Sequence, residues 1–418
     1  MKIAFISYEY PPDAAYGGIA TYVRQAASML ATRGHHVEVF TSSPERSGAY
    51  DEEGIVVHRI LEESHAKFPA AIARQFAARH ASIRFDVLEG PEYGADAYEA
   101  VMLVPDIPLI VKLHTPSFLL TAITYEGLAP FNPMRLRLLL GRVRKYVTQL
   151  AHGKKPVWRY THKYGLERER LHTLEADEVV TPSRSLGEIT AAAWNLDAAR
   201  IIHLPYPYTP SPQLLEIPID TSTNVVTFIG RLEVRKGVID LARAIPQVLK
   251  SHPQTKFRFV GPADESPKRG QNMRQYLERI LGKYAGSVEF TGAVPVNRIA
   301  DVLAATDICV FPSIWENFAN VCLESMAAGR GVIASECGGM AEMLDFGKVG
   351  LTIPPRSPKR LANAMIDLLD NPILRKEFGQ AARQRLLDEY NIDRISVLQE
   401  QSYQRAIETR RSAGSRAH

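Results

Sequence analysis

Two glutamates stand eight residues apart in the stretch WENFANVCLE (315–324). Carboxylates accept hydrogen bonds from hydroxyl groups, so such a pair could bind a sugar or a ribose. The run DICVFPS (307–313) predicts a buried strand, and Phe318–Ala328 predicts a helix. Glu316 is therefore expected in the loop at the carboxyl edge of a strand, and Glu324 in the second turn of the helix. The free amides at the helix start favour a phosphate between the two carboxylates. A surface helix with ordinary acidic residues is the alternative.

Cationic residues occur in the stretch FIGRLEVRKG (228–237), where a predicted strand is followed by a loop and a helix. Arg231 and Lys236 lie in that loop. Cations beside a helix N-terminus favour an anion, most simply a phosphate or a diphosphate. A solvated basic loop is the alternative explanation.

Two further features stand where a predicted strand ends. Gly17 and Gly18 lie between the first predicted strand and the first helix, where glycine lets the backbone approach a ligand closely. His114 ends the predicted strand PLIVKLH (108–114) and could contact a polar ligand, with a structural histidine as the alternative. Neither GxGxxG nor GxxxxGK[ST] occurs, so the dinucleotide fingerprint and the P-loop are both absent.

The elements that must position these residues alternate between strand and helix in two separate series. The chain of 418 residues is long for one core, and a proline-rich stretch (204–213) separates the series. We therefore predict an α/β protein of two doubly wound Rossmann-like domains that face each other across a cleft. The predicted units are an acceptor-side domain (1–207), a nucleotide-sugar-binding domain (208–392), a C-terminal helix that returns to the first domain (393–408) and a disordered basic tail (409–418).

Bulk composition excludes several classes of protein. The net charge of +4 is small and no nucleic-acid recognition motif is present, so we expect no nucleic-acid partner. Three cysteines without CxxC spacing argue against a disulfide framework and against a zinc site, and they favour a reducing, cytoplasmic location. The N-terminal apolar run is too short for a signal peptide, and no run reaches the roughly 18 apolar residues of a transmembrane helix.

Together these stretches resemble glycosyltransferase family 4, the retaining nucleotide-sugar transferases of the GT-B fold. The similarity spans nearly the whole chain and is carried by the early glycine pair, KLHTPS, GRLEVRKG, VEFTGAV and PSIWENFANVCLESMAAGRGVIAS. The last of these is the most specific, because the two glutamates, the MAxG that follows and a short buried strand match the family signature. In place of an EGFG-like turn, this chain has ENFAN, with Asn317 and Ala319 where many members have glycine.

The resemblance implies a role for each candidate residue. Arg231, Lys236 and Gly18 would contact the donor diphosphate, with Gly17 beside them, and Glu316 and His114 would face the donor sugar. Glu324 would bind the ribose, and Val294 would lie near the nucleobase. The backbone amides of Phe318, Ala319, Asn320 and Val321 would contact phosphate and sugar hydroxyls.

The resemblance also implies a reaction. The cations and the helix N-terminus would stabilise the departing diphosphate, and the acceptor hydroxyl would attack on the same face. No DxD motif occurs, which agrees with catalysis that needs no metal. The resemblance implies a hexosyltransferase that uses no cofactor. The expected acceptor is a carbohydrate or a lipid-linked glycan, in cell-envelope or exopolysaccharide synthesis. A nucleotide-sugar epimerase and a non-catalytic nucleotide-binding scaffold are the alternatives.

A basic segment suggests what lies on the acceptor side. No acidic residue occurs between Glu126 and Glu167, whereas nine lysines and arginines do. Leucines and valines fall on one helical face of the segment 134–165 and basic residues on the other, as in helices that rest on anionic membranes. A peripheral location at the inner face of the membrane is one interpretation, and a helix packed on its own domain is the other.

Overall fold

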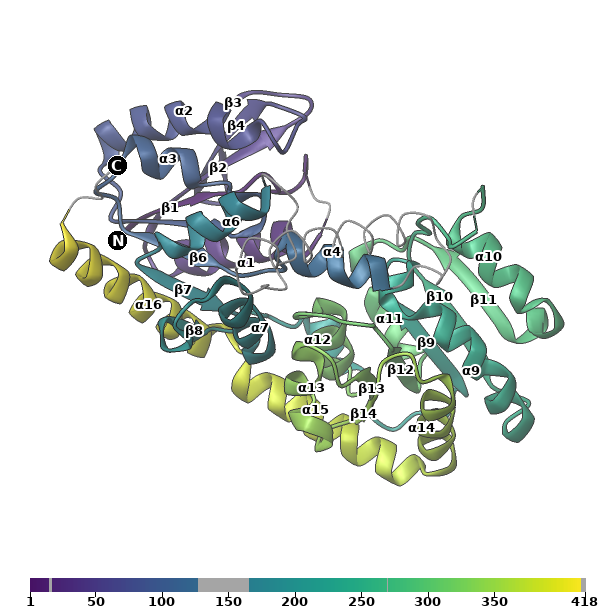
Figure 1. Ribbon diagram of the computed structural model, residues 1–418. Helices are drawn as coiled ribbons and strands as arrows, with labels where there is room; N and C mark the ends of the chain where they lie inside the picture. Colours follow the sequence, from purple (N-terminus) through teal and green to yellow (C-terminus); the bar gives the residue numbers. More distant parts are fainter. Residues whose placement is uncertain (15–16, 127–164, 269, 415–418) are drawn as a thin grey trace, which may run out of the picture.

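The computed structural model describes residues 1–14, 17–126, 165–268 and 270–414, and it consists of two α/β domains (Figure 1). Helices pack against one mainly parallel sheet in each domain, so the predicted fold class is confirmed. The described helices include none that is both long and apolar enough to cross a membrane. The predicted membrane-binding segment 134–165 lies outside the described residues, apart from its last position.

The N-terminal sheet has eight strands in the order β3-β4-β2-β1-β5-β6-β7-β8, and only β3 runs antiparallel to its neighbour. The central strands are buried on both faces, which explains why they read as continuous apolar runs. The strands are β1 Lys2–Ile6, β2 His36–Ser43, β3 Gly48–Glu52, β4 Ile55–Leu61, β5 Val87–Pro91, β6 Leu109–Lys112, β7 Glu178–Thr181 and β8 Ile201–His203.

The C-terminal sheet has six parallel strands in the order β11-β10-β9-β12-β13-β14. Its core lies on both faces, beneath α9 and α14 on one side and α12 and α15 on the other. The strands are β9 Val225–Ile229, β10 Lys256–Val260, β11 Val288–Gly292, β12 Ile308–Phe311, β13 Gly331–Ser335 and β14 Leu351–Ile353.

Helices alternate with the strands in both domains (Figure 1). In the N-terminal half they are α1 Gly18–Thr32, α2 Phe68–Ile83, α3 Tyr98–Leu103, α4 Ser117–Glu126, α6 Gly165–Leu174 and α7 Arg184–Trp194. From the linker onward they are α8 Pro212–Glu216, α9 Val238–Ser251, α10 Met273–Ile280, α11 Ile299–Ala304, α12 Asn320–Ala327, α13 Gly339–Met343, α14 Pro358–Asp370, α15 Pro372–Glu389 and α16 Ile392–Ala413.

Helix α16 (yellow in Figure 1) returns from the C-terminal domain and packs against β5, β6 and β7 of the N-terminal sheet. Gln399 and Tyr403 on this helix donate hydrogen bonds to the buried Glu89 on β5. The prediction of disorder from residue 409 is wrong for 409–413, which continue the helix. These residues are ordered by a tertiary contact, because Arg410 forms a largely buried ion pair with Asp177 at 2.6 Å. This contact stabilises the end of the helix despite its polar composition.

Candidate active site

Each sheet has a switch point, where the chain leaves two central strands in opposite directions. In the C-terminal sheet it lies between β9 and β12, and in the N-terminal sheet between β1 and β5. Ligands of open α/β sheets bind beyond the carboxyl ends of the strands at such points. The loops after β9 and β12 contain Arg231, Lys236 and Glu316, and the loop after β1 leads to Gly17 and Gly18.

Glu316 lies between two cations of the neighbouring loop. Its Oε2 forms an ion pair with Nζ of Lys236 and is 3.5 Å from Nη1 of Arg235. Burial opposes ionisation of this carboxyl, but Lys236 and then Arg235 outweigh it and hold the pKa of Glu316 below its usual range. Arg235 was not selected from the sequence, although it stands beside Lys236 in the same basic loop. Glu316 is therefore an ionised carboxylate that is bound to Lys236 in this structure.

Arg231 lies at a more exposed position, with its Nη1 3.6 Å from Oδ2 of Asp264. Its charge also acts on Glu9, which belongs to the loop after β1 in the opposite domain. Burial raises the pKa of Glu9 above its ordinary value, and Arg231 opposes this rise. The charge of Arg231 thus reaches a carboxylate of the opposite domain.

Helix α12 begins at Asn320, so the expected start at Phe318 is two residues early. The side chain of Phe318 explains the difference, because it packs between Tyr206 and Tyr390 in an aromatic cluster before the helix starts. Ala319 occupies the N-cap position and provides no side-chain hydrogen bond to the first amides. Because no N-cap side chain accepts hydrogen bonds from these amides, they can donate to an anion.

Glu324 has a buried oxygen, Oε2, that has no hydrogen-bond partner within the described part of the chain. Burial raises the pKa of Glu324 to about 7. An acceptor left without a donor in a buried place is costly unless a ligand or water satisfies it. Asn320 Oδ1, one turn earlier, is likewise buried without a described partner. The start of α12 therefore offers two acceptors that hydroxyl groups could satisfy.

His114 follows β6 and is almost completely buried. Its Nδ1 lies 2.5 Å from the hydroxyl of Tyr206, a residue of the linker, and its backbone amide donates to the buried Glu92 at 2.7 Å. Burial, reinforced by the charge of Lys112, holds the pKa of His114 well below its usual range. The imidazole is therefore neutral at physiological pH.

The glycine pair lies at the start of α1, with Gly17 at the N-cap position and Gly18 as the first helical residue. A Cβ placed on Gly18 would meet no described heavy atom within 4 Å, and one on Gly17 would lie 3.7 Å from Oε2 of Glu9. The close approach of a ligand requires such an open backbone.

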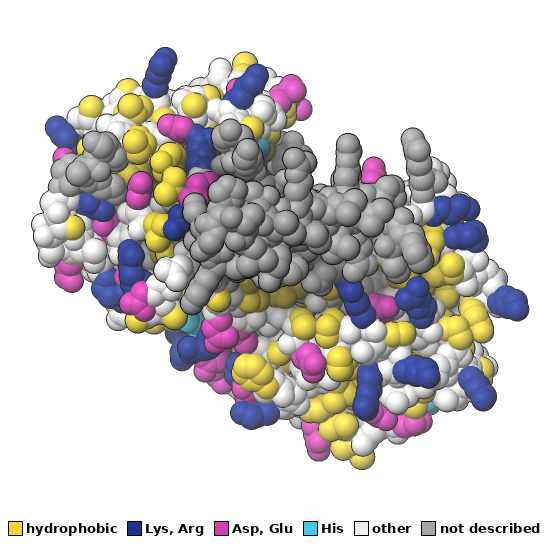
Figure 2. Space-filling model, in the orientation of Figure 1, with side chains coloured by type: hydrophobic (Ala, Val, Ile, Leu, Met, Phe, Trp, Pro, Cys, Tyr) yellow, Lys and Arg dark blue, Asp and Glu magenta, His cyan; other side chains and the backbone are white. Residues whose placement is uncertain are grey.

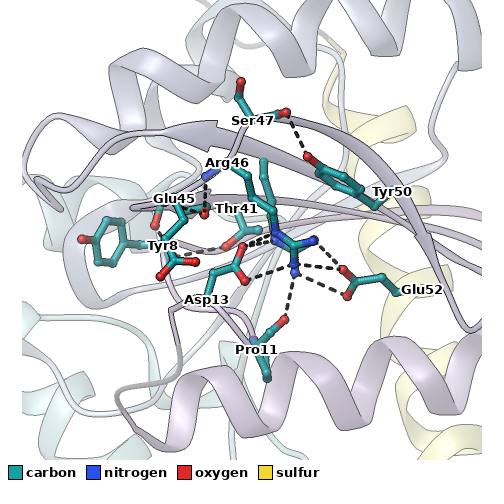
Figure 3. A network of polar contacts seen from close by, with 12 residues as sticks. Tyr8, Pro11, Asp13, Thr41, Glu45, Arg46, Ser47, Tyr50 and Glu52 are labelled. Carbon is teal, nitrogen blue, oxygen red and sulfur yellow. Dashed lines mark hydrogen bonds and ion pairs between the residues drawn. The ribbon is translucent and has the colours of Figure 1, made fainter.

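A network of ion pairs fixes the loop that leads to this glycine pair (Figure 3). Asp13 in the loop accepts hydrogen bonds from Arg46 at 2.8 and 3.0 Å, and it pairs with Arg59 at 2.9 Å. Arg59 is fully buried on β4, where it also pairs with Glu52 and donates to the carbonyl of Pro11. The loop after β1 is thus held against β3 and β4.

The remaining predicted residue, Val294, follows β11 and is partly buried against the core. The substituted turn also keeps ordinary backbone angles, since neither Asn317 nor Ala319 has a positive φ and so neither position requires glycine. Of the predicted site residues, a direct contact joins Lys236 to Glu316. The roles in binding and catalysis that the sequence assigns to all of these residues stay predictions, those of Lys236, Glu316, Glu324 and His114 included.

Comparison with known proteins identifies the family. Residues 17–207 match the glycosyl transferase 4-like domain, and residues 223–371 match glycosyl transferases group 1. A glycogen synthase from Mycobacterium tuberculosis is 27% identical over 441 residues, which cover 96% of this chain and 94% of that protein.

Two solved structures share the fold. A sucrose-phosphate synthase from Thermosynechococcus elongatus has a TM-score of 0.75 at 24% identity, covering 97% of this chain and 99% of the other. HepE from Anabaena, in complex with UDP, has a TM-score of 0.69 at 17% identity, covering 97% and 100%. With both of its domains matched in order, the chain belongs to the family 4 glycosyltransferases, which have the GT-B fold.

Proposed function

We propose that this protein is a retaining hexosyltransferase. It would move a sugar from a nucleotide diphosphate-sugar to a carbohydrate or a lipid-linked glycan, in cell-envelope or exopolysaccharide biosynthesis. The observation that carries the proposal is the arrangement around α12. An ion-paired Glu316 precedes the helix, beside the cationic loop at the switch point, and the helix contains Glu324, whose buried Oε2 has no hydrogen-bond partner among the described residues. The similar structure with bound UDP supports a nucleotide ligand.

The donor would lie across the start of α12. Arg231, Lys236 and the first amides of the helix would hold the diphosphate, because all three present positive charge or N–H donors to it. Glu324 would accept hydrogen bonds from the ribose hydroxyls, which would satisfy its orphaned oxygen. Val294 would lie near the nucleobase. The backbone at Gly17 and Gly18 would approach the diphosphate from the opposite domain.

The chemistry follows from where the negative charge develops. When the glycosidic bond to the diphosphate breaks, Lys236 and Arg231 stabilise the leaving oxygen electrostatically. The acceptor hydroxyl then attacks from the same face and gives its proton to that leaving oxygen, so the anomeric configuration is retained. The neutral imidazole of His114 can donate a hydrogen bond to a sugar hydroxyl. Glu316 is a poor nucleophile because Lys236 neutralises it, which disfavours a covalent intermediate.

Neither a metal nor a cofactor enters this scheme. Among the described residues, no group of three or more His, Cys, Asp and Glu side chains is arranged to hold a metal ion. Metal independence is a proposal that turnover in the presence of a chelator would test.

The first experiment is a thermal-shift screen of UDP, GDP, ADP and their sugar conjugates. A ligand that binds only the native state stabilises it by RT ln(1 + [L]/Kd), so the preferred base should give the largest shift. Lys236→Ala should abolish the shift, whereas Lys250→Ala, an exposed lysine at the end of α9, should leave it intact. A wild-type protein that none of these nucleotides stabilises would overturn the proposed donor class.

The second experiment follows the sugar by NMR. The wild type should transfer the hexose of the preferred donor to a glycan or lipid-linked acceptor with unchanged anomeric configuration. An inverted product would overturn the retaining mechanism. Donor incubated alone should keep its sugar configuration, and isomerisation there would instead indicate an epimerase. Sedimentation with anionic vesicles would test peripheral membrane binding.

A further inference from the structure

The loop between β12 and α12 projects into the N-terminal domain. Trp315 in this loop is buried in a hydrophobic cluster with N-terminal residues that include Leu113, Phe118 and Leu186. The loop that carries Glu316 is therefore in direct contact with the opposite domain, so any separation of the domains would disturb it.

Asn317 extends this contact with two hydrogen bonds. Its Oδ1 accepts a hydrogen bond from the Ser183 hydroxyl at 2.8 Å, and its Nδ2 donates to the backbone carbonyl of His114. Ser183 follows β7 and His114 follows β6, which are adjacent strands of the N-terminal sheet. The side chain is only 4% exposed, so both of its polar ends are satisfied by the other domain.

The surroundings of Asn317 leave no free space. A Cβ on Gly339 would lie 1.9 Å from the carbonyl oxygen of Asn317 and 2.7 Å from Cβ of Ser183. Glu342 on α13 accepts hydrogen bonds from the amides of Arg184 and Ser185, at 2.9 and 2.8 Å, at the start of α7. The interface therefore has one geometry in which all of these contacts can form together.

We propose that Asn317 is a positioning residue. It couples closure of the two domains to the arrangement of the loop between β12 and α12, which contains Glu316. Its neighbours in the chain are Glu316 and Phe318, which the resemblance to family 4 places at the donor sugar and phosphate. Its hydrogen bond to the carbonyl of His114 places the backbone of His114 against the same loop. When the domains separate, both hydrogen bonds break and the loop loses the contacts that orient it. This inference deepens the proposed function and rests on it for the identity of the ligand.

The test combines scattering with kinetics. Asn317→Ala removes both hydrogen bonds, and Asn317→Asp keeps an acceptor for Ser183 but faces the His114 carbonyl with a second acceptor. Small-angle X-ray scattering should show a larger radius of gyration for both variants than for the wild type. Asn363→Ala is the matched control, because Asn363 bonds Gln247 on the exposed surface of the C-terminal domain; it should leave the radius unchanged.

Kinetics should separate positioning from donor binding. We expect kcat/KM for transfer to fall by about tenfold to a hundredfold in both Asn317 variants, as for a small misplacement of reacting groups. The Kd for the nucleoside diphosphate should change less than about twofold, because most of its proposed contacts, those of Arg231, Lys236 and Glu324, come from the C-terminal domain. In a Ser183→Ala background, Asn317→Ala should have a smaller effect, because one of its hydrogen bonds is already absent.

Two results would overturn the inference. An unchanged radius of gyration would show that Asn317 does not hold the domains together. If the Kd for the nucleoside diphosphate rose by the same factor by which kcat/KM fell, Asn317 would act inside the donor site alone. If the wild type transferred no sugar, the proposed function would fail, yet the scattering would still decide whether Asn317 holds the domains closed.

Discussion

Replacing Glu324 with glutamine should stabilise the free protein and weaken nucleotide binding at the same time. Burial raises the pKa of this carboxyl from 4.5 to about 7. Each pKa unit corresponds to about 1.4 kcal/mol, so ionising Glu324 costs the folded state roughly 3 kcal/mol. Since the side chain is not wholly shielded from water, we expect about 2–3 kcal/mol. The penalty is absent below pH 4.5, grows as the pH rises to 7 and is constant above that.

The assay is urea unfolding of wild type and Glu324→Gln at pH 5 and at pH 8.5, followed through the transition of the C-terminal domain. The stability difference between the two proteins should grow in favour of the glutamine variant by about three quarters of the amount above, because part of the penalty is already present at pH 5. Glu377→Gln, an exposed glutamate on α15, serves as the control and should show no such growth. A stability difference that is equal at the two pH values would refute the reasoning.

The same variant should bind the preferred nucleoside diphosphate about tenfold more weakly at pH 8. The reason is that an ionised acceptor for the ribose hydroxyls is replaced by a neutral one, at a cost of about 1.4 kcal/mol. Isothermal titration calorimetry would measure it. A gain in stability combined with a loss in affinity distinguishes a ligand-binding carboxylate from a structural one.

Three further substitutions test the contacts around the site. Lys236→Ala should also lower the free energy of unfolding by about 1–3 kcal/mol, because the largely buried Glu316 is left with Arg235 as its single cationic partner in the loop. Adding Glu316→Gln should restore most of this stability in urea unfolding, and a double variant as unstable as Lys236→Ala would contradict the ion pair. Tyr206→Phe should lower kcat about fivefold at unchanged nucleotide Kd, because His114 loses a hydrogen bond of about 1 kcal/mol; an unchanged kcat would argue against this orientation. Glu342→Ala should cost about 1 kcal/mol in thermal unfolding, because the amides of Arg184 and Ser185 lose their acceptor; a neutral result would show that the N-cap Ser183 is sufficient to stabilise the start of α7.

Most of the strands that the sequence predicted are buried on both faces, because continuous apolar runs identify them; β11, which is partly exposed along its length, is the exception. Four strands were missed. β3 (GAYDE) is a largely exposed edge strand, β4 (IVVHRIL) has a polar pair in the middle of its apolar run, and β8 and β14 have only three residues each. The α12 boundary was misplaced because the aromatic packing of Phe318 is a tertiary effect. The helical segment 409–413 was missed for the same kind of reason, since its ion pair reaches Asp177 in the other half of the chain.

Only the residues of the candidate site that belong to short local sequence patterns could be predicted. Lys236 and Glu316 were selected because each follows a strand in a short, recognisable pattern, and the structure joins them in an ion pair. The contacts of Asn317 could not be predicted, since they depend on how two separately patterned domains pack together. Ser183 is 134 positions away in sequence, and no periodicity relates the two residues.

The course of α16 has a consequence for how the chain is made. Residues 392–413 are synthesised after both sheets, yet Gln399 and Tyr403 satisfy Glu89, a carboxylate that is fully buried in the first domain. While the ribosome is still translating the second domain, that carboxylate lacks these two partners, and the part of the first sheet that α16 contacts, at β5, β6 and β7, is uncovered by it. The first domain therefore completes its fold last, and a nascent chain stalled before residue 392 is the form that chaperones and proteases should recognise.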